Sequence, residues 1–334
     1  MDCLNCSFPP IQYEIHFEGE ANIKMLPVLH KHIKRQNGWA LQNENILVVM
    51  EESVLELFDF CIEHMLPDRI FYRIHGTSWD SFSTISSVIE AQWIDDLIAQ
   101  KKITPFFQPI VDQEGNIFGH EILSRSLRED GTFIPPNELF LAAKKRNRLF
   151  ALDRLCRLTA VQHSAVLKNQ KIFINFLPTS IYSPEHCLRT TLELARTIGV
   201  NPANFVFEVV ESENVEDTEH LKNILHFYKQ QGFEYALDDV GEGFSTVELL
   251  KELQPAYMKL DMKYVQGVCA DSQKQEMACK ILQAALEAGS IPLAEGIESN
   301  EDFDYLKKQG FQLFQGYLFG KPAPAPLQSF RMRA

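Results

Sequence analysis

The sequence predicts an α/β fold: an irregular, TIM-like (β/α)8 barrel whose first strand is antiparallel, preceded by a small α+β domain. From Thr104 onward, strand-like and helix-like segments alternate strictly, and such alternation is typical of a parallel sheet. Eight strand-like runs fall in this part of the chain, as a (β/α)8 barrel requires. Only residues 113–116 separate the first two runs. Because parallel neighbours need a crossover of about a dozen residues or more, this first pair should be antiparallel.

The barrel strands should be short apolar runs, and amphipathic helices should fill most of the gaps between them. The expected strands are 106–111, 117–123, 171–176, 205–210, 235–237, 257–260, 290–294 and 312–314. The expected helices include 149–167, 186–198, 219–231 and 273–288. We therefore expect the barrel domain to occupy residues 104–334.

Residues 1–80 are expected to form a separate, small α+β domain. Its strand and helix periods follow the order β-α-β-β-α-β, which is the order of a ferredoxin-like unit. The strands are expected at 11–17, around Trp39, at 46–50 and at 70–75, and the helices at 23–35 and 53–65. No glycine-rich phosphate loop, cofactor lysine or histidine-rich cluster occurs in this stretch. We expect a regulatory domain that acts as a sensor, a dimerisation element or a scaffold for an unidentified protein partner.

Residues 81–103 should connect the two domains. From Trp79 to Lys102 the sequence is polar at first and then amphipathic, with apolar residues at helical spacing between Val88 and Ile98. A helix with such a stripe faces a core or a docking surface. We expect one connecting helix.

Cys3 and Cys6 have the spacing of half a zinc site, which His30 and His32 could complete. No second CxxC pair supplies the usual partner ligands. A mobile N-terminal tail is therefore the favoured interpretation, and a zinc site is the alternative.

The composition is that of a soluble globular protein: 334 residues, 45% hydrophobic and 23% charged. No apolar run approaches the ~20 residues of a membrane-spanning helix, and no signal peptide is visible, so we expect a cytoplasmic protein without a membrane partner. The seven scattered cysteines argue against a disulfide framework. The net charge of −13 argues against a surface for nucleic-acid polymers, and we expect none as a partner. An acidic pocket can nevertheless bind a phosphate ester when divalent cations lie between them.

Asp238 and Asp239 stand between an apolar strand and a glycine turn, in the run YALDDVGEGFS of residues 235–245. Adjacent carboxylates repel each other unless a cation or a shared proton relieves the repulsion. Gly241 and Gly243 would let the backbone approach a ligand closely. The alternative is a solvated hairpin turn, in which Asp and Gly are ordinary residues.

Polar residues recur near the carboxyl ends of the expected strands, where barrel enzymes keep their catalytic groups. These residues are Glu121, Asn175, Glu208, Asp238, Asp239, Lys259, Glu295 and Gln315. Carboxylates within apolar strands are costly unless they are paired or bind metal, and hard oxygen ligands select Mg²⁺ or Mn²⁺. Two such ions would suit the cleavage of a phosphodiester. Lys259 would contact the nucleophilic water or accept its proton; the alternative is a simple ion pair.

Eight segments together resemble the ordered motifs of one family. They are FFQPIV at 106–111, HEILSR at 120–125, INFLP at 174–178, FEVVES at 207–212, LDDVGEGFS at 237–245, MKLD at 258–261, AEGIES at 294–299 and QGYLFGKP at 315–322. On these motifs the chain resembles the EAL-domain phosphodiesterases over residues 104–324. The resemblance implies an irregular barrel with an antiparallel first strand. It also implies hydrolysis of cyclic di-GMP to linear pGpG with Mg²⁺ or Mn²⁺, and a homodimer.

The resemblance assigns roles to individual residues of this chain. It implies that Glu121, Asn175, Glu208 and Asp238 hold a first metal ion and that Asp238, Asp239 and Glu295 hold a second. Lys259 and Gln315 match positions around the catalytic water, and Glu211 matches a glutamate that anchors the loop after the two aspartates; with Glu121 these form the implied catalytic group. On the substrate side, Gln108 and Arg125 match residues that contact the dinucleotide, and Glu298 matches an outer support of the same site.

Two segments depart from the family pattern. The signature Glu-Ala-Leu is Glu121-Ile122-Leu123 here, which keeps the ligand. The loop that commonly reads DFGTG has Val240 and Glu242 in this chain, so it lacks an aromatic anchor and gains a negative charge. A weakly active or inactive cyclic di-GMP receptor, or a protein-interaction module on the same barrel, is therefore the alternative function. A phosphodiesterase for another cyclic nucleotide is a third.

Overall fold

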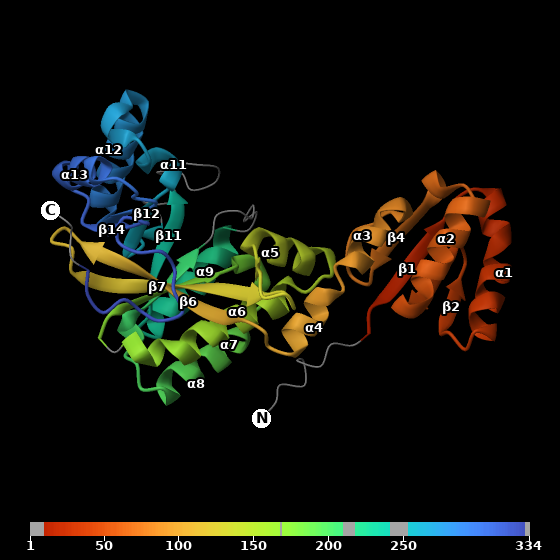
Figure 1. The fold of residues 1–334 in the computed structure, drawn as a ribbon. Helices are drawn as coiled ribbons and strands as arrows, with labels where there is room; N and C mark the ends of the chain where they lie inside the picture. Colours follow the sequence, from red (N-terminus) through yellow and green to blue (C-terminus); the bar gives the residue numbers. More distant parts are fainter. Residues whose placement is uncertain (1–9, 168, 210–217, 241–252, 331–334) are drawn as a thin grey trace. The chain divides into compact units, whose positions relative to one another are not determined.

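The computed structural model describes residues 10–167, 169–209, 218–240 and 253–330, and these form two compact units (Figure 1). Unit 1 comprises the chain up to Lys102 together with Ile134–Leu152. Unit 2 comprises Ile103–Phe133 and the chain from Asp153 onward. Among the described residues, no helix is both long enough and apolar enough to cross a bilayer.

Unit 1 contains an antiparallel sheet of order β2-β3-β1-β4-β5. Its elements follow each other as β-α-β-β-α-β, as predicted, with the short strand β5 added at one edge. The bounds are β1 Gln12–Phe17, α1 Glu20–Arg35, β2 Ala40–Asn43, β3 Ile46–Met50, α2 Val54–His64, β4 Ile70–Ile74 and β5 Asp80–Ser81. The central strand β1 lies between β3 and β4, which is the topology of a split βαβ unit. The small α+β region expected ahead of the barrel is therefore present.

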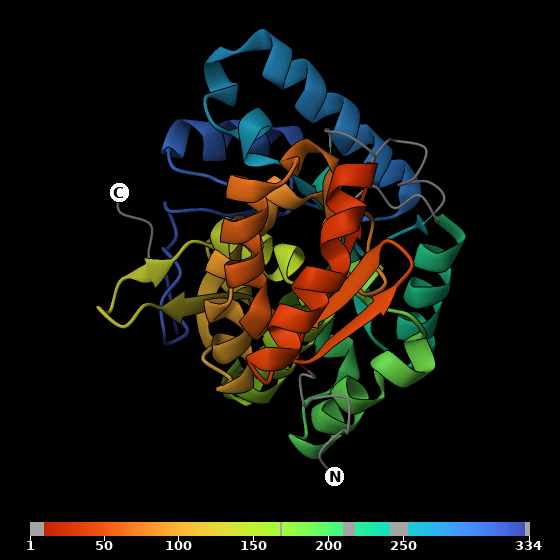
Figure 2. The same cartoon turned by 90° about the vertical axis from the view of Figure 1, so that its right-hand side faces the viewer.

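The core of unit 1 follows from the period of its strands. Tyr13, Ile15 and Phe17 alternate along β1 and are buried, while Glu14 and His16 point to the opposite face. Apolar stripes of α1 and α2 belong to the same core, and Figure 2 shows the two helices (red and orange) lying together over the strands. Burial of these stripes is the main source of the unit's stability.

The segment after β5 forms two short helices, α3 Ile85–Glu90 and α4 Trp93–Ala99, rather than one connecting helix. The amide of Gln92 donates to Ile89 O and that of Ile94 to Ala91 O, so three-residue turns interrupt the helical ladder. No glycine or proline marks this break in the sequence. The apolar spacing nevertheless identified buried residues, namely Ile85, Val88, Ile94, Leu97 and Ile98.

Unit 2 is a closed barrel of eight strands, as predicted. The order around the barrel is β6-β14-β13-β12-β11-β10-β9-β7, and pairing of β6 with β7 closes it. Strand β6 is antiparallel to both β7 and β14, and all other pairs are parallel. The bounds are β6 Thr104–Asp112, β7 Ile117–Leu127, β9 Lys171–Phe176, β10 Phe205–Val209, β11 Glu234–Val240, β12 Tyr257–Leu260, β13 Ile291–Ala294 and β14 Leu313–Gln315. The irregular first strand is therefore confirmed, and Figure 1 shows β6 and β7 as a long yellow hairpin.

Helices surround the strands in sequence order. They are α6 Leu149–His163, α7 Pro184–Cys187, α8 Arg189–Thr197, α9 Thr218–Gln230, α11 Met262–Val265, α12 Ser272–Ala288 and α13 Asn300–Gln309, with 3₁₀ turns such as η6 Pro178–Ser180 between them. The predicted helix 149–167 ends in a 3₁₀ turn from Ser164, and 186–198 divides into α7 and α8. Helix α5 Pro136–Lys145 precedes α6 in the chain and belongs to unit 1.

The barrel has two apolar layers, which the two-residue strand period separates. Residues such as Ile172, Ile174 and Phe207 pack between the strands and the helices. A second set comes from the alternate positions of seven strands and forms its own buried cluster: Ile110, Phe173, Val206, Ala236, Tyr257, Leu293 and Leu313. This second set fills the interior of the barrel and forms the floor beneath the candidate site.

Candidate metal centre

The candidate site is built from the residues two positions beyond the interior apolar layer. Because side chains on the same face of a strand repeat every second residue, a polar residue two positions after an interior apolar one also points into the barrel. The pairs are Phe173 and Asn175, Val206 and Glu208, Ala236 and Asp238, Tyr257 and Lys259, Leu293 and Glu295, and Leu313 and Gln315. The ring of polar residues predicted at the strand ends is therefore a geometric consequence of strand alternation.

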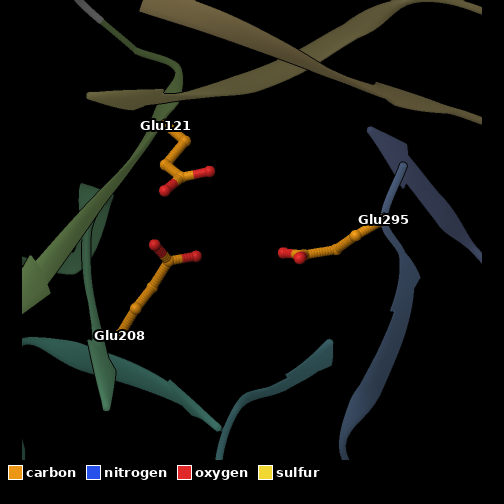
Figure 3. Close-up of side chains that lie close together, drawn as sticks. All are labelled: Glu121, Glu208 and Glu295. Atoms are coloured by element: carbon orange, nitrogen blue, oxygen red, sulfur yellow. The ribbon is translucent and has the colours of Figure 1, made fainter. Parts of the chain in front are cut away.

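Three carboxylates of this ring converge. Each of Glu121, Glu208 and Glu295 offers an oxygen, and these oxygens lie within 4.8 Å of one another. Figure 3 shows the three side chains reaching from β7, from β10 and from the end of β13 toward a shared space. Convergent hard oxygen ligands at this spacing are suited to a divalent cation.

Lys259 lies among the carboxylates. Its ammonium nitrogen is 2.6 Å from Glu208 Oε1 and 3.2 Å from Asp238 Oδ1, and it forms a close ion pair with Glu295 Oε1. Glu121 Oε2 is farther away, at 3.9 Å. Burial alone would lower the pKa of Lys259, but the surrounding carboxylates raise this pKa well above its usual 10.5. Lys259 is therefore a fixed positive charge at the centre of the ring.

Glu121 is the carboxylate that neutral donors support. Asn175 Nδ2 donates to its Oε1 at 2.6 Å, and Gln315 Nε2 donates to its Oε2 at 2.7 Å. Burial would raise the pKa of Glu121, but Lys259 and these two amides hold it below the usual 4.5. Glu121 is therefore ionised, and it is oriented by Asn175 on β9 and Gln315 on β14.

The other two carboxylates of the cluster have too few partners. Burial raises the pKa of Glu208 well above 4.5, and repulsion from Glu121 adds to this rise. Burial and then repulsion from Asp238 raise the pKa of Glu295 in the same way. Four carboxylates face one ammonium, so the ring carries more negative charge than Lys259 can balance.

The donor set fits a metal ion. Glu208 Oε2 and Gln315 Oε1 are buried and accept no hydrogen bond from any residue that the structure describes. Buried oxygen acceptors without donors are costly, and a cation removes that cost. All three clustered residues are carboxylates, so they offer oxygen ligands and no sulfur or imidazole nitrogen. Such a ligand set favours Mg²⁺ or Mn²⁺ over Zn²⁺.

The remaining predicted residues lie around this ring or outside the described part of the chain. Gln108 on β6 pairs in register with Glu121 on β7. Arg125 lies two residues after Leu123 on β7, and Glu121 is among the charges that act on its guanidinium. Glu298 is exposed. The side chain of Asp239 and all of Glu211 lie outside the described residues, as does Glu242.

One glycine lets the loops of the site approach each other. The amide of Ile297 donates to Gln315 O, and the amide of Leu318 donates to Ile297 O, so the segment after Glu295 is hydrogen-bonded to the segment after β14. A Cβ on Gly316 would overlap the backbone of Ile297. Gly316 therefore brings Gln315 and Glu295 into one site.

Residues 91–322 match the EAL domain family. A curated relative, the probable cyclic di-GMP phosphodiesterase PdeG of Escherichia coli strain K12, is 33% identical over 230 residues, which are 66% of this chain and 45% of PdeG. The chain thus spans less than half the length of this relative.

Solved structures give the same result. A standalone EAL protein from Vibrio cholerae O395, in its cyclic di-GMP-bound form, has a TM-score of 0.61 and 36% identity and covers 68% of this chain and 95% of its own. BlrP1 of Klebsiella pneumoniae, in a calcium and cyclic di-GMP complex, has a TM-score of 0.60 and 20% identity over 94% of this chain and 96% of its own, which is a likeness of fold alone. With the family match covering more than half of the chain and the barrel ring at the motif positions, the chain belongs to the EAL domain family.

Proposed function

We propose that this protein is a metal-dependent phosphodiesterase that hydrolyses cyclic di-GMP to linear pGpG. The observation that carries the proposal is the ring of carboxylates around the buried Lys259, in which oxygens of Glu121, Glu208 and Glu295 converge within 4.8 Å. Membership of the EAL domain family supports the reaction class. The cyclic di-GMP bound to the Vibrio cholerae relative supports the choice of substrate.

Two Mg²⁺ or Mn²⁺ ions are the proposed cofactors. Glu121, Asn175, Glu208 and Asp238 would hold one ion, and Asp238, Asp239 and Glu295 would hold the other. When bound, such a pair polarises a phosphodiester and lowers the pKa of water between the ions. The calcium in the BlrP1 complex supports the use of a divalent ion by this fold.

The protein groups supply position and charge. Lys259, a permanent cation beside Glu208 and Asp238, would donate hydrogen bonds to the attacking water, with Gln315 beside it. Arg125 would bind a phosphate of the dinucleotide through its forked donors, and Gln108 would contact the same ligand. Glu211 would anchor the loop after Asp239, and Glu298 would support the site from outside.

The wider setting belongs to the same proposal. Residues 1–80 would regulate the barrel of residues 104–334 through the segment 81–103, with an unidentified protein as a partner of the first domain. We propose a homodimer, in keeping with the family. The cytoplasmic location expected from the sequence is part of the same proposal.

Incubation of the purified protein with cyclic di-GMP and Mg²⁺ or Mn²⁺ tests the activity, with the product followed by chromatography. We expect pGpG to form, and removal of the metal by a chelator to stop its formation. Glu121→Ala should lower turnover by more than about 100-fold, since changes merely outside a metal's ligand shell cost about 10–100-fold. Glu276→Ala, at an exposed position of α12, is the matched control and should keep full activity. Intact cyclic di-GMP with either metal would refute the proposal.

A receptor without turnover is the second candidate, and the sequence of one loop favours it. Val240 and Glu242 replace an aromatic anchor and add a negative charge beside the metal ligands. Saturable binding of cyclic di-GMP by the wild-type protein, with no pGpG formed at any metal concentration, would support this candidate over the enzyme.

A further inference from the structure

We propose that Asp153 is a positioning residue for the metal centre. Its carboxylate fixes the turn that follows β9 and thereby holds Asn175 in place against Glu121. The inference rests on one part of the proposed function, the binding of a metal ion by Glu121 and Asn175.

Asp153 lies in the first half of α6, and its side chain is almost fully buried, with 2% exposed. Its Oδ1 accepts the backbone N–H of Leu177 at 2.9 Å. The hydroxyl of Ser180 lies 2.9 Å from its Oδ2 and 2.7 Å from Leu177 O, so this one donor is shared between the carboxylate and the turn. Leu177 is the single residue between β9 and the 3₁₀ turn η6, and Ser180 is the last residue of that turn. Both oxygens of one helical carboxylate are thus bound to one short turn.

That turn is adjacent to a proposed metal ligand. Leu177 is two residues beyond Asn175, whose amide donates to Glu121 at 2.6 Å. The strand β9 ends at Phe176, so its regular pairing with β10 ends there as well. The bonds to Asp153 therefore take over the task of fixing the backbone at the point where the sheet no longer does so.

A buried cation balances the charge of Asp153. Arg157 lies one helical turn later, is fully buried, and donates to Asp153 Oδ2 at 3.3 Å and to Thr191 Oγ1 at 2.5 Å. Both charged residues lie in a helix stripe that is otherwise apolar, between Leu152 and Val161. Replacing a buried ion pair by apolar residues of similar volume is often neutral or stabilising, so stability does not explain why charges occupy this stripe.

The need to orient the groups that donate to Asp153 explains better why charged residues lie in this stripe. A leucine at position 153 would fill the volume but would leave the buried N–H of Leu177 without an acceptor. A carboxylate accepts from a backbone amide and a hydroxyl at once, and it fixes both relative to α6. We infer that the ion pair is retained for the position of the turn, and through the turn for the position of Asn175.

The decisive experiment measures Mn²⁺ affinity in the full-length protein by the electron paramagnetic resonance signal of the free ion. The variant Asp153→Leu with Arg157→Met removes both charges and keeps an apolar stripe, so it should fold. We expect its Mn²⁺ affinity to fall by about 10–100-fold, as for other supports of metal ligands. A folded double variant with the affinity of the wild type would overturn the inference.

A milder matched pair decides the question if the double variant does not fold. Ser180→Ala and Thr191→Val each remove one buried hydroxyl of the same network, but only Ser180 belongs to the turn after β9, whereas Thr191 is on α8. We expect Ser180→Ala to weaken Mn²⁺ binding. Ser180→Thr, which keeps the hydroxyl, and Thr191→Val should both bind Mn²⁺ with the affinity of the wild type. A lower melting temperature for Ser180→Ala with unaltered Mn²⁺ affinity would show a purely structural role and refute the inference.

The readout separates this inference from the proposed function. A wild-type protein that binds Mn²⁺ but does not hydrolyse cyclic di-GMP refutes the enzyme, while the variants still test Asp153 through affinity. A wild-type protein that binds no Mn²⁺ refutes both.

Discussion

Lys259 shows how a single residue makes a cluster of acids compatible with folding. Glu208 has no exposed surface, and Lys259 has 1%, so neither charge is relieved by water. Strand alternation places both side chains inside the barrel, and their separation of 2.6 Å makes Lys259 the direct counter-charge of Glu208, while Lys259 also forms a close ion pair with Glu295. The ammonium therefore has a structural task in the protein without metal, in addition to its proposed task toward the catalytic water.

Replacement of Lys259 by methionine tests the structural task. Removing one partner from a buried ion pair typically costs about 3–5 kcal/mol. We expect Lys259→Met to lower the free energy of unfolding by about this amount in the presence of a chelator, as measured by urea denaturation. Mn²⁺ should reduce the difference from the wild type, because ions bound to the folded state stabilise it and take over the counter-charge. A loss that Mn²⁺ leaves unchanged would contradict metal binding by these carboxylates.

Gly316 is the second residue whose chemistry the site requires. Any side chain at this position would meet the backbone of Ile297, which carries the loop after Glu295. Gly316→Ala should destabilise the protein by about 1–3 kcal/mol, as overpacking does, and should also weaken Mn²⁺ binding because Gln315 and Glu295 move apart. Gly131→Ala is a suitable control, since it adds backbone strain at φ 82° without a neighbour within 4 Å. Equal Mn²⁺ affinities in the two variants would argue against the role of Gly316 in the site.

At the scale of elements, the barrel strands were predictable because side chains alternate between the two faces of each strand with a period of two residues. Phe173 and Asn175, or Val206 and Glu208, are two residues apart on one strand, so the sequence alone indicates that they share a face. The antiparallel first strand was predictable from the short turn after Asp112. The site followed from the same pattern, since polar residues interrupt apolar strands at equivalent positions.

Other elements could not be predicted from local pattern. The break between α3 and α4 has no glycine or proline to signal it, and helix α5 joins unit 1 through contacts far apart in the sequence. Asp153 and Arg157 were missed because an i, i+4 pair of opposite charges usually marks an exposed helix face. The sequence indicates their burial only through their position within an apolar stripe of the helix, between Leu152 and Val161.

Arg146, at the end of α5, connects several elements of unit 1. It is buried, with 1% exposed, and is paired with Glu51 before α2 and with Asp95 on α4. The hydroxyl of Tyr13 on β1 donates to Glu51 and accepts from Arg146. Arg148 also pairs with Asp95. The buried Arg146 and its half-buried partners hold the helix α5 to the sheet and to α4.

The pH dependence of unit 1 follows from Glu51. Partial burial would raise the pKa of Glu51, but hydrogen bonds from Arg146 and Tyr13 hold it below the usual 4.5. A depressed folded-state pKa stabilises the protein above pH 4.5, and this stability is lost as the pH falls through the folded-state value. We expect the free energy of unfolding to fall below about pH 4.5 in the wild type and to depend less on pH in Glu51→Gln. Glu52→Gln, next to it and exposed, should keep the wild-type profile; identical profiles for all three proteins would exclude Glu51 as the origin.

At the scale of the whole molecule, the family match and the barrel do not begin at the same residue. The first barrel strand starts at Thr104, whereas the match to the EAL domain family starts at residue 91 and includes α4. Helix α4 belongs to unit 1 together with α5, and α5 lies in the chain between two barrel elements. The expected boundary at residue 104 would therefore separate α5 from its packing partner.

Two shortened chains test this boundary, one starting at residue 91 and one at residue 104. Both contain α5, whose buried residues Leu139, Ala142 and Ala143 form its apolar face, but only the longer one keeps α4 with Asp95. We expect trypsin to cleave after Lys144 and Lys145 much faster in the chain from residue 104, because α5 there has lost both the apolar contacts of α4 and the partner of Arg146. Mass spectrometry of the fragments over time measures this, with the full-length chain as the protected reference. Equal cleavage of the two shortened chains at these lysines would show that α4 does not protect α5, and residue 104 would then be an adequate boundary.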